Sequence, residues 1–473
     1  MLIASGLEML EIDKYAIEKL GVPSEKLMEN AAKAVMKAVL KYVKEKSQTA
    51  VFCGSGNNGG DGKIVARLLN NQGIYTRCFL ISEEINIEEV ELFCKDYDII
   101  IDAIFGIGLN RAVEGKAVEV IKLINSLNKP VIAVDMPSGI SADTGEIRGE
   151  AVKATETITF SMPKFGQMVT PGALYCGKIE IADIGIPKEA FETAKFHGRM
   201  TDAKFVSKFF PTRNVDSHKG DYGKVLIIAG SEGMTGAALL AAKAALRCGS
   251  GLVSVGVPRN IYSIVATGAL EAMVFPLPDK RKEILKRLEN CDVCLIGPGM
   301  GISEESSVIV ANILQNASVP VVIDADAITA ISKQPKMLQG ASCPKIITPH
   351  DGEFKRLGGF QGKNRLNSAI DFAKKHNCTL VLKGCKTITA NSSGFVWCNT
   401  TGNAGMATAG SGDVLAGVIA SIIGRGYAPD EAVAAAVWVH GKAGDICAEK
   451  FGQYGMTAGD LIEALPKAIL PVL

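Results

Sequence analysis

A glycine-rich stretch near the C-terminal end of the chain ends in a carboxylate, and this combination could bind a phosphate and move a proton. Residues 403–413 read NAGMATAGSGD and directly precede the apolar, helix-like run VLAGVIASIIG. Glycine lets backbone N–H groups come close to a ligand, and the start of a helix adds a dipole that favours a negative charge. Asp413 would lie where it could accept a proton from a reacting hydroxyl. We therefore predict an anion-binding turn with Asp413 as its base.

A second glycine-rich turn occupies residues 54–62, with the sequence GSGNNGGDG between the strand-like run TAVFC and the helix-like run KIVARLLNNQG. It contains GxGxxG, and Glu83 follows the next apolar run at about the spacing of the ribose-binding acid of a dinucleotide fold. A tight strand-to-helix turn without a ligand would give the same pattern, so the motif alone is weak. The polar side chains of Asn57, Asn58 and Asp61 favour a binding site, because a simple phosphate turn would have small or apolar residues there.

Two further apolar runs end in groups that could act on a substrate or bind an ion. Asp102 lies in DAIFGIGLNRA, and Asp135 lies in DMPSG with Ser138. In a parallel sheet these segments and the turn at 54–62 would meet at one edge and place amide, carboxylate and hydroxyl oxygens around a single pocket. Such oxygen-rich sites suit a hard cation. Each aspartate alone would more often form a turn or cap a helix, but together they favour a site.

Other candidate residues allow two interpretations from the local sequence. His350, in TPHDGEF after an apolar run, could contact a substrate or complete a turn. Lys383, followed by residues 384–388, could meet a nucleotide phosphate or cap the edge of a sheet. Cys291 and Cys294 form a CxxC without a second pair or a nearby histidine pair, so we interpret them as core thiols.

Alternating strand-like and helix-like segments predict two α/β domains that would position these residues. After a helix-like start, the first part has apolar runs at TAVFC, RCFLI, YDIIIDAIF, KPVIAVDMPSG and ETITFSM. The second part has KVLIIAG, GLVSVGV, VCLIGPG, PVVIDAD, KIITPH and TLVLKG. This alternation is typical of mostly parallel sheets covered by helices. The pattern lapses between residues 186 and 214, and 473 residues exceed one core, so we place the boundary near residue 200.

Composition and charge indicate an ordinary cytoplasmic enzyme. The 51 basic and 50 acidic residues nearly balance, which removes the electrostatic argument for nucleic acid or an anionic membrane as partner. The start of the chain lacks the pattern of a signal peptide, and the twelve cysteines lie mostly in apolar runs, as expected in a reducing compartment. No zinc-type histidine spacing, GxSxG or GxxxxGK[ST] is present, which argues against metallohydrolases, serine hydrolases and Walker-type sites.

The motifs NNGGDG, DAIFGIGL and DMPSG, with the helix-like LMENAA, resemble the YjeF N-terminal family of NAD(P)H-hydrate epimerases over residues 1–200. The resemblance implies a Rossmann-like parallel-sheet domain, Asp135 as the catalytic carboxylate, and a potassium ion near Asn58, Asp102 and Ser138. A carbon that bears a hydroxyl and a ring nitrogen can invert through a planar cation, which a fixed carboxylate could stabilise. The implied substrate contacts are Asn57, Asn58, Gly59, Gly60, Asp61, Gly106, Ile107, Gly108, Leu109, Asn110, Arg111, Ala112 and Asp135.

Seven motifs of the second half, in order HKGDYGKVLIIAGS, TGAALLAAKAALRCGSG, GPGMG, DADAIT, TPHDGEF, LKGCKT and NAGMATAGSGD, resemble the ADP-dependent NAD(P)H-hydrate dehydratases over residues 205–473. The resemblance implies a ribokinase-like α/β/α fold, ADP as co-substrate with Mg²⁺, and Asp413 as catalytic base. Ser411 stands where ribokinase-like enzymes often have alanine, and it is small enough for the same turn. The implied substrate contacts are Gly236, Gly301, His350 and Asp413. The implied ADP contacts are Gly384, Cys385, Lys386, Thr387, Ile388, Asn403, Ala404, Gly405, Met406, Ala407, Thr408, Ala409, Gly410, Ser411 and Gly412.

These resemblances predict a bifunctional isomerase and lyase that repairs hydrated NADH and NADPH, with ADP as the further small-molecule partner and homo-oligomeric assembly. Two alternatives stay open at this point. The second half could be a kinase for a vitamin alcohol, with the first half as an accessory dinucleotide-binding domain. The chain could also bind dinucleotides as a sensor without turnover, in which case Asp135 and Asp413 would be dispensable.

Overall fold

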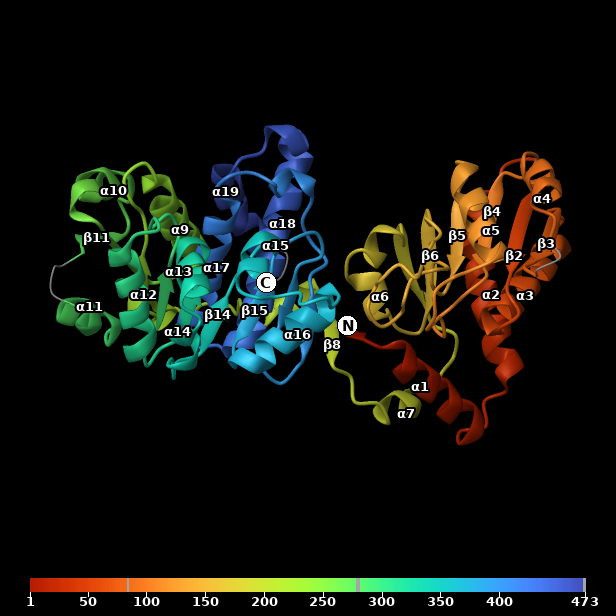
Figure 1. The fold of residues 1–473 in the computed structure, drawn as a ribbon, viewed down its shortest axis with the longest axis horizontal. Helices are drawn as coiled ribbons and strands as arrows, with labels where there is room; N and C mark the ends of the chain where they lie inside the picture. Colours follow the sequence, from red (N-terminus) through yellow and green to blue (C-terminus); the bar gives the residue numbers. More distant parts are fainter. Residues whose placement is uncertain (83–84, 278–280, 471–473) are drawn as a thin grey trace. The chain divides into compact units, whose positions relative to one another are not determined.

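The computed structural model describes residues 1–82, 85–277 and 281–470, and the chain folds into two compact units. One unit spans Leu2–Gly198, and the other spans Arg199–Leu473 together with Met1 (Figure 1). Each unit has the α/β architecture that the sequence predicts. Glu83 lies outside the described residues. Among the described helices, none is long and apolar enough to cross a membrane.

A parallel sheet of six strands forms the centre of the first unit, in the order β3-β2-β4-β5-β6-β7. The order reverses between β2 and β4, and in doubly wound sheets ligands bind beside this reversal at the carboxyl ends of the strands. The strands of this unit are β1 (Leu2–Ile3), β2 (Thr49–Cys53), β3 (Thr76–Leu80), β4 (Ile99–Ala103), β5 (Val131–Val134), β6 (Glu156–Phe160) and β7 (Lys178–Ala182).

Helices cover both faces of this sheet. Apolar side chains of α1, α2, α3 and α7 pack into one core cluster, and those of α4 and α5 pack into another. Strands β2 and β4 are buried over their whole length, which explains why their sequences are continuous apolar runs. The helices are α1 (Gly6–Glu18), α2 (Ser24–Leu40), α3 (Asn57–Asn71), α4 (Ile87–Cys94), α5 (Lys116–Ser126), α6 (Phe165–Met168) and α7 (Lys188–Glu192).

The second unit has a mixed sheet in the order β8-β17-β16-β15-β14-β13-β12-β9-β10-β11. From β15 to β11 neighbouring strands are parallel, whereas β15, β16 and β17 pair antiparallel. The strands are β8 (Gly198–Met200), β9 (Lys224–Ile228), β10 (Leu252–Val257), β11 (Met273–Pro276), β12 (Val293–Ile296), β13 (Val321–Ile323), β14 (Lys345–Ile347), β15 (Thr379–Leu382), β16 (Ile388–Ala390) and β17 (Val396–Cys398).

A core cluster of this unit joins the sheet to α9, α17, α18 and α19. Helix α17 is buried almost completely, because its sequence is apolar all round after the glycine turn. The helices are α8 (Ala203–Ser207), α9 (Thr235–Arg247), α10 (Tyr262–Gly268), α11 (Arg281–Leu288), α12 (Glu304–Asn316), α13 (Ala325–Lys333), α14 (Lys336–Gln339), α15 (Asp351–Arg356), α16 (Arg365–His376), α17 (Ser411–Gly424), α18 (Pro429–Gly455) and α19 (Ala458–Ile469).

Candidate active sites

The first unit has a cavity of about 510 Å³ where β2, β4 and β5 end. Most of the residues predicted as epimerase contacts line it: Asn57, Asn58, Asp61, Gly106, Ile107, Gly108, Leu109, Asn110, Arg111 and Asp135. Gly59, Gly60 and Ala112 are not among its lining residues. Gly59 has a structural role, since a Cβ at this position would lie 1.9 Å from the Gly54 carbonyl oxygen.

Asp135 is a carboxylate that lines this cavity. It follows β5 with a φ of +62°, and its side chain is 10% exposed. Its Oδ1 accepts hydrogen bonds from Lys164 Nζ at 2.5 Å, from the backbone N–H of Phe160 at 3.0 Å and from the hydroxyl of Thr159 at 3.2 Å. In the described part of the chain its Oδ2 has no such partner, so one oxygen is fixed and the other is available to a ligand.

Lys164 is a functional candidate that the sequence analysis missed. Its side chain is 1% exposed, and besides Asp135 its ammonium donates to Thr159 Oγ1 at 2.9 Å and to the Phe160 carbonyl at 3.1 Å. Gln167 adds a hydrogen bond from Nε2 to the carbonyl oxygen of Asp135 at 2.7 Å. Together these contacts fix the position of Asp135, and they explain how a residue other than glycine keeps a positive φ there.

Asp102 and Ser138, predicted as potassium ligands, are hydrogen-bonded to each other and buried. The backbone N–H of Ser138 donates to Asp102 Oδ2 at 2.7 Å, and its hydroxyl donates to Oδ1 at 2.5 Å. Burial raises the pKa of Asp102 to about 6, although these hydrogen bonds and one from the Ile104 backbone N–H act in the opposite direction. Asn58 is also buried, and its Nδ2 has no partner among the described residues.

In the second unit, the glycine turn leads into α17 as predicted from the sequence. Gly410 has a φ of +85° directly before the helix, a conformation that favours glycine, and Asp413 lies in the first helical turn. A Cβ at Gly412 would lie 3.5 Å from Lys383 Nζ and 4.0 Å from Asp324 Oδ2. The turn therefore approaches the carboxyl ends of β13 and β15 closely.

Lys383 lies beside Asp324, whose side chain is buried. Its Nζ donates to Asp324 Oδ1 at 2.9 Å and lies 3.9 Å from Glu353 Oε2. The interpretation of Lys383 as a sheet-edge residue is wrong, because it follows β15, which lies between β14 and β16.

Burial raises the pKa of Asp413 to about 6, with a further increase from the negative Asp324 and a decrease from the positive Lys383. A carboxyl whose pKa is closer to neutral pH can both accept and release a proton there.

The predicted substrate residues of this unit follow different strands. His350 caps α15 with its Nδ1, which accepts the backbone N–H of Gly352 at 3.0 Å, and its side chain is otherwise exposed. Gly301, after β12, has a φ of +75° and donates its N–H to Asp326 Oδ2 at 2.8 Å. Gly236 is the second residue of α9. A Cβ at Gly301 would lie 3.5 Å from Ser231 Oγ in the loop before α9, so these loops meet.

The two segments predicted to contact ADP are both held by local hydrogen bonds. In the segment 384–388, Thr387 donates its hydroxyl to the carbonyl oxygen of Gly384 at 3.0 Å, and the Cys385 side chain is exposed. In the segment 403–412, the Asn403 side chain accepts the N–H of Gly405 at 3.0 Å and donates to Asp445 at 3.1 Å. These hydrogen bonds fix the turns of both segments, and fixed glycine-rich turns are the form in which backbone N–H groups bind phosphate.

Comparison with known proteins agrees with this division of the chain. The family profile described as NAD(P)H-hydrate dehydratase matches residues 225–467, and the one described as YjeF-related protein N-terminus matches residues 24–91 and 79–166. The bifunctional NAD(P)H-hydrate repair enzyme of Moorella thermoacetica is 38% identical, over 98% of this chain and 96% of that one. The chain belongs to this family.

Solved structures relate the second unit of the repair enzyme to the ribokinase-like fold. An ADP/ATP-dependent NAD(P)H-hydrate dehydratase from Bacillus subtilis, co-crystallised with ATP and Mg²⁺, matches with a TM-score of 0.51 and 31% identity over 58% of this chain and 98% of that one. A ribokinase-like protein from Enterococcus faecalis matches with a TM-score of 0.53 and 29% identity over 58% of this chain and 96% of that one. The predicted ribokinase-like architecture is confirmed.

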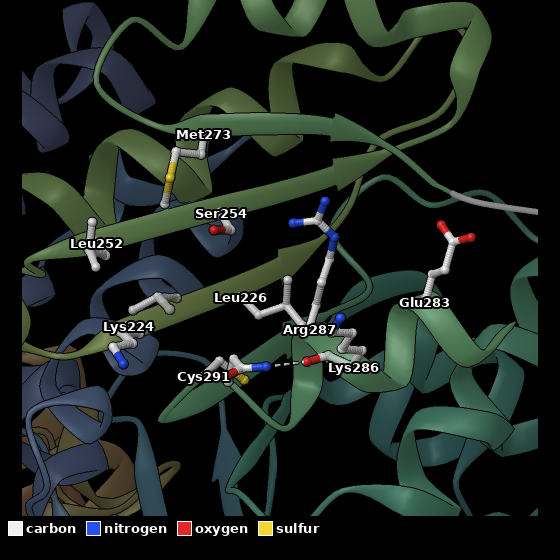
Figure 2. Close-up of a pocket in the computed structure, with 11 residues that line it drawn as sticks. Lys224, Leu226, Leu252, Ser254, Met273, Glu283, Lys286, Arg287 and Cys291 are labelled. Atoms are coloured by element: carbon white, nitrogen blue, oxygen red, sulfur yellow. Dashed lines mark hydrogen bonds between the residues drawn. The ribbon is translucent and has the colours of Figure 1, made fainter. Parts of the chain in front are cut away.

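The repair enzyme has a further cavity of about 470 Å³, shown in Figure 2, that contains none of the predicted site residues. Its walls come from β9, β10, β11 and α11 and carry charges of both signs: Lys224, Glu283, Lys286 and Arg287. Arg287 packs over the Phe275 ring at 3.7 Å, and Cys291 lies buried at the cavity wall. Cys294 is buried in β12, so both cysteines of the CxxC are core thiols as predicted.

Proposed function

We propose that the repair enzyme runs two reactions in two separate sites. The first unit interconverts the R and S forms of NADH hydrate and NADPH hydrate, and the second unit returns the S form to NAD(P)H with hydrolysis of ADP to AMP and phosphate. Family membership gives NAD(P)H-hydrate repair as the activity. The observation that most directly supports two sites is that each unit has its own candidate catalytic carboxyl. In the first unit this is Asp135 after β5, whose Oδ1 is held by Lys164, and in the second it is Asp413 in α17.

The epimerase mechanism that we propose depends on the fixed position of Asp135. The hydrated ring carbon bears a hydroxyl and the ring nitrogen, so loss of the hydroxyl as water leaves a planar C=N⁺ cation. Lys164 holds Oδ1 of Asp135, while Oδ2 is free of partners in the described residues and can face this cation and accept a proton from the returning water. Water that adds to the opposite face of the ring gives the other epimer.

A potassium ion is part of the epimerase proposal, with Asn58, Asp102 and Ser138 as the residues that would hold it. Their oxygen atoms suit a hard cation. Asp102 is fully buried and no basic side chain pairs with it in the described chain, so a bound cation would balance its charge. When bound, the ion would stabilise the negative charge of Asp102 at the end of β4, the strand that leads to the predicted substrate contacts at residues 106–112.

This mechanism predicts that epimerisation exchanges the hydroxyl oxygen with solvent. In water enriched in oxygen-18, each inverted molecule should gain one heavy oxygen atom, because the original oxygen leaves as water. Single-turnover reactions analysed by mass spectrometry would measure the label, with enzyme-free hydrate as the control for spontaneous exchange. Inversion with complete retention of the original oxygen would instead indicate opening of the ring carbon–nitrogen bond and would rule out the planar cation.

The dehydratase mechanism that we propose is phosphoryl-assisted, because hydroxide is a poor leaving group. Asp413 accepts the proton of the ring hydroxyl, and the hydroxyl oxygen attacks the terminal phosphorus of ADP, whose bond to the bridging oxygen of AMP breaks. The phosphate then leaves with the carbon–oxygen bonding pair, and loss of a proton from the neighbouring ring carbon restores the double bond. The glycine turn before α17 would bind the phosphates, so that positioning supplies much of the acceleration. Mg²⁺ bound to the nucleotide would neutralise phosphate charge, as its presence with ATP in the Bacillus subtilis relative supports.

The proposed function can be tested with a mixed-epimer preparation of NADH hydrate. The purified chain is incubated with ADP, with ATP or with neither, while 340 nm absorbance reports reduced nicotinamide and chromatography reports the epimer ratio. We expect epimerisation in all three arms and dehydration with ADP. A product that retains phosphate from ATP would favour the kinase alternative, and binding without turnover would favour the sensor. The cytoplasmic location and homo-oligomeric assembly stay predictions.

A further inference from the structure

Helix α1 (Gly6–Glu18) places an acidic residue in the middle of an apolar stripe that faces the epimerase cavity. Leu10, Asp13 and Ile17, at helical spacings of three and four, all line this cavity. The neighbouring face of the helix, with Met9 and Ile12, is buried in the core of the unit. Leucine at position 13 would make this wall of the cavity wholly apolar. The carboxyl of Asp13 is therefore an exception that needs an explanation.

The position of this helix is fixed by contacts with the loops of the cavity. The backbone N–H of Gly6 donates to Asp143 Oδ1 at 2.6 Å, and a Cβ at Gly6 would lie 2.9 Å from the Ile107 carbonyl oxygen. Ser5 and Glu8 form a reciprocal capping box at the start of the helix. The Asp13 carboxyl is therefore presented to the cavity from a rigid element.

Asp13 has no hydrogen bond or ion pair with any described residue, and its Oδ1 is buried. Asp61, on α3, lines the same cavity and is 9% exposed as a residue, and its buried Oδ1 also has no partner among the described residues. Buried polar atoms in native proteins are nearly always paired with the protein or with ordered water, and an unpaired one calls for an explanation such as a catalytic role. Both residues line one cavity, so a polar substrate group bound there would give these carboxyls a partner.

We propose that Asp13 is a second catalytic residue of the epimerase, which donates a proton to the departing hydroxyl while Asp135 accepts one from the incoming water. This inference rests on the epimerase activity proposed above. The carbon–oxygen bond breaks with its electron pair on oxygen, the oxygen takes the proton of Asp13 and leaves as water, and the ring nitrogen lone pair forms C=N⁺. A water molecule then adds to the other face and loses a proton to Asp135. For the opposite inversion the two carboxyls exchange roles.

The charges around Asp13 support a proton-bearing carboxyl. Burial raises the pKa of Asp13 to about 6, the negative Asp135 raises it as well, and the positive Lys164 lowers it. Asp61 faces the same cavity, and burial, with the charges of Asp135 and Asp13, raises its pKa to about 7. Asp135 differs from both, because it has the ammonium of Lys164 at 2.5 Å. The cavity thus contains a carboxyl whose environment favours the protonated form, Asp13, and a carboxyl paired with an ammonium, Asp135. The reaction needs one group of each kind, a proton donor and a proton acceptor.

The test compares the full-length Asp13→Asn variant with wild type and with Glu11→Gln, an exposed position on the same helix. We expect kcat for epimerisation to fall about 100-fold or more in Asp13→Asn, with KM for NADH hydrate little changed, since a general acid acts in the transition state. Wild-type kcat should fall as pH rises above the pKa of Asp13, and this alkaline limb should be absent in the variant. The melting temperature should not decrease, because the carboxyl has no hydrogen bond or ion pair with a described residue to lose. ADP-dependent dehydration of the isolated S form, in the other unit, should be unchanged.

Three results would overturn this inference while the proposed function stands: wild-type kcat in Asp13→Asn, a loss confined to KM, or a lower kcat whose alkaline limb persists. The last would show that Asp13 only positions other groups. Failure of the wild-type chain itself to interconvert the epimers would instead contradict the proposed epimerase activity, so the two failures are distinguishable. Glu11→Gln should retain the rate, the pH profile and the melting temperature of wild type.

Discussion

The Asp413→Asn variant is expected to lose about 10²–10⁴-fold in kcat for ADP-dependent dehydration, the usual contribution of a positioned general base. Asn has the shape of Asp but cannot accept the hydroxyl proton, and position 413 is half-buried at the start of α17, where the amide fits. Lys383 keeps its contact with Asp324, so no buried charge loses its partner. The loss would be measured as the rate of 340 nm recovery from the S hydrate at saturating ADP.

The pH dependence of the wild-type reaction gives a second measurement of the same role. A base must be ionised to act, and burial raises the pKa of Asp413 to about 6. Dehydration should therefore be constant above this value and fall about tenfold per pH unit well below it. Epimerisation by the variant is the internal control, because it uses a separate unit. Loss of both activities in a folded variant would contradict the two-site proposal, and unchanged dehydration would exclude Asp413 as the base.

Most of the strands that the sequence predicted are buried over most of their length. Runs such as TAVFC and ETITFSM are continuous because β2 and β6 are covered on both faces of a parallel sheet. The sequence analysis missed six of the described strands. In β7 and β11 the side chains are partly exposed. The others have only two or three residues each: β1, β8, β16 and β17. Short or half-exposed strands depend on pairing with neighbours that a local pattern does not reveal.

The candidate site was predictable where chemistry lies within a local motif. The glycine turns with Asp61 and Asp413 are visible because turn and carboxylate are adjacent in sequence. Lys164 and Asp13 were missed for the opposite reason. Lys164 comes 29 residues after Asp135, and a lysine or aspartate in a mixed sequence is usually a surface residue. Only the tertiary fold brings Lys164 to Asp135 and places Asp13 on the cavity that Asp135 lines.

The Asp135→Asn variant is expected to lose about 10²–10⁴-fold in epimerisation, since the amide can neither stabilise the ring cation as a charge nor accept a proton. Asn tolerates the positive φ of +62° at this position, so the turn itself should survive. The substitution has a second effect, however, because it leaves the ammonium of Lys164 buried without its carboxylate. Removal of one partner of a buried ion pair costs about 3–5 kcal/mol of folding free energy, which could lower activity through unfolding alone.

The double variant with Asp135→Asn and Lys164→Met separates the two effects. Methionine has nearly the length of the lysine stem without its charge, so the double variant should recover most of the denaturation free energy lost in Asp135→Asn. Its epimerisation should stay as low as that of the single variant, whereas dehydration of the S form should match wild type in both. Chemical denaturation and the chromatographic epimer assay would measure these quantities. If epimerisation returned with stability, Asp135 would be a structural partner of Lys164, and the carboxyl that acts on the substrate would have to be sought elsewhere in the cavity.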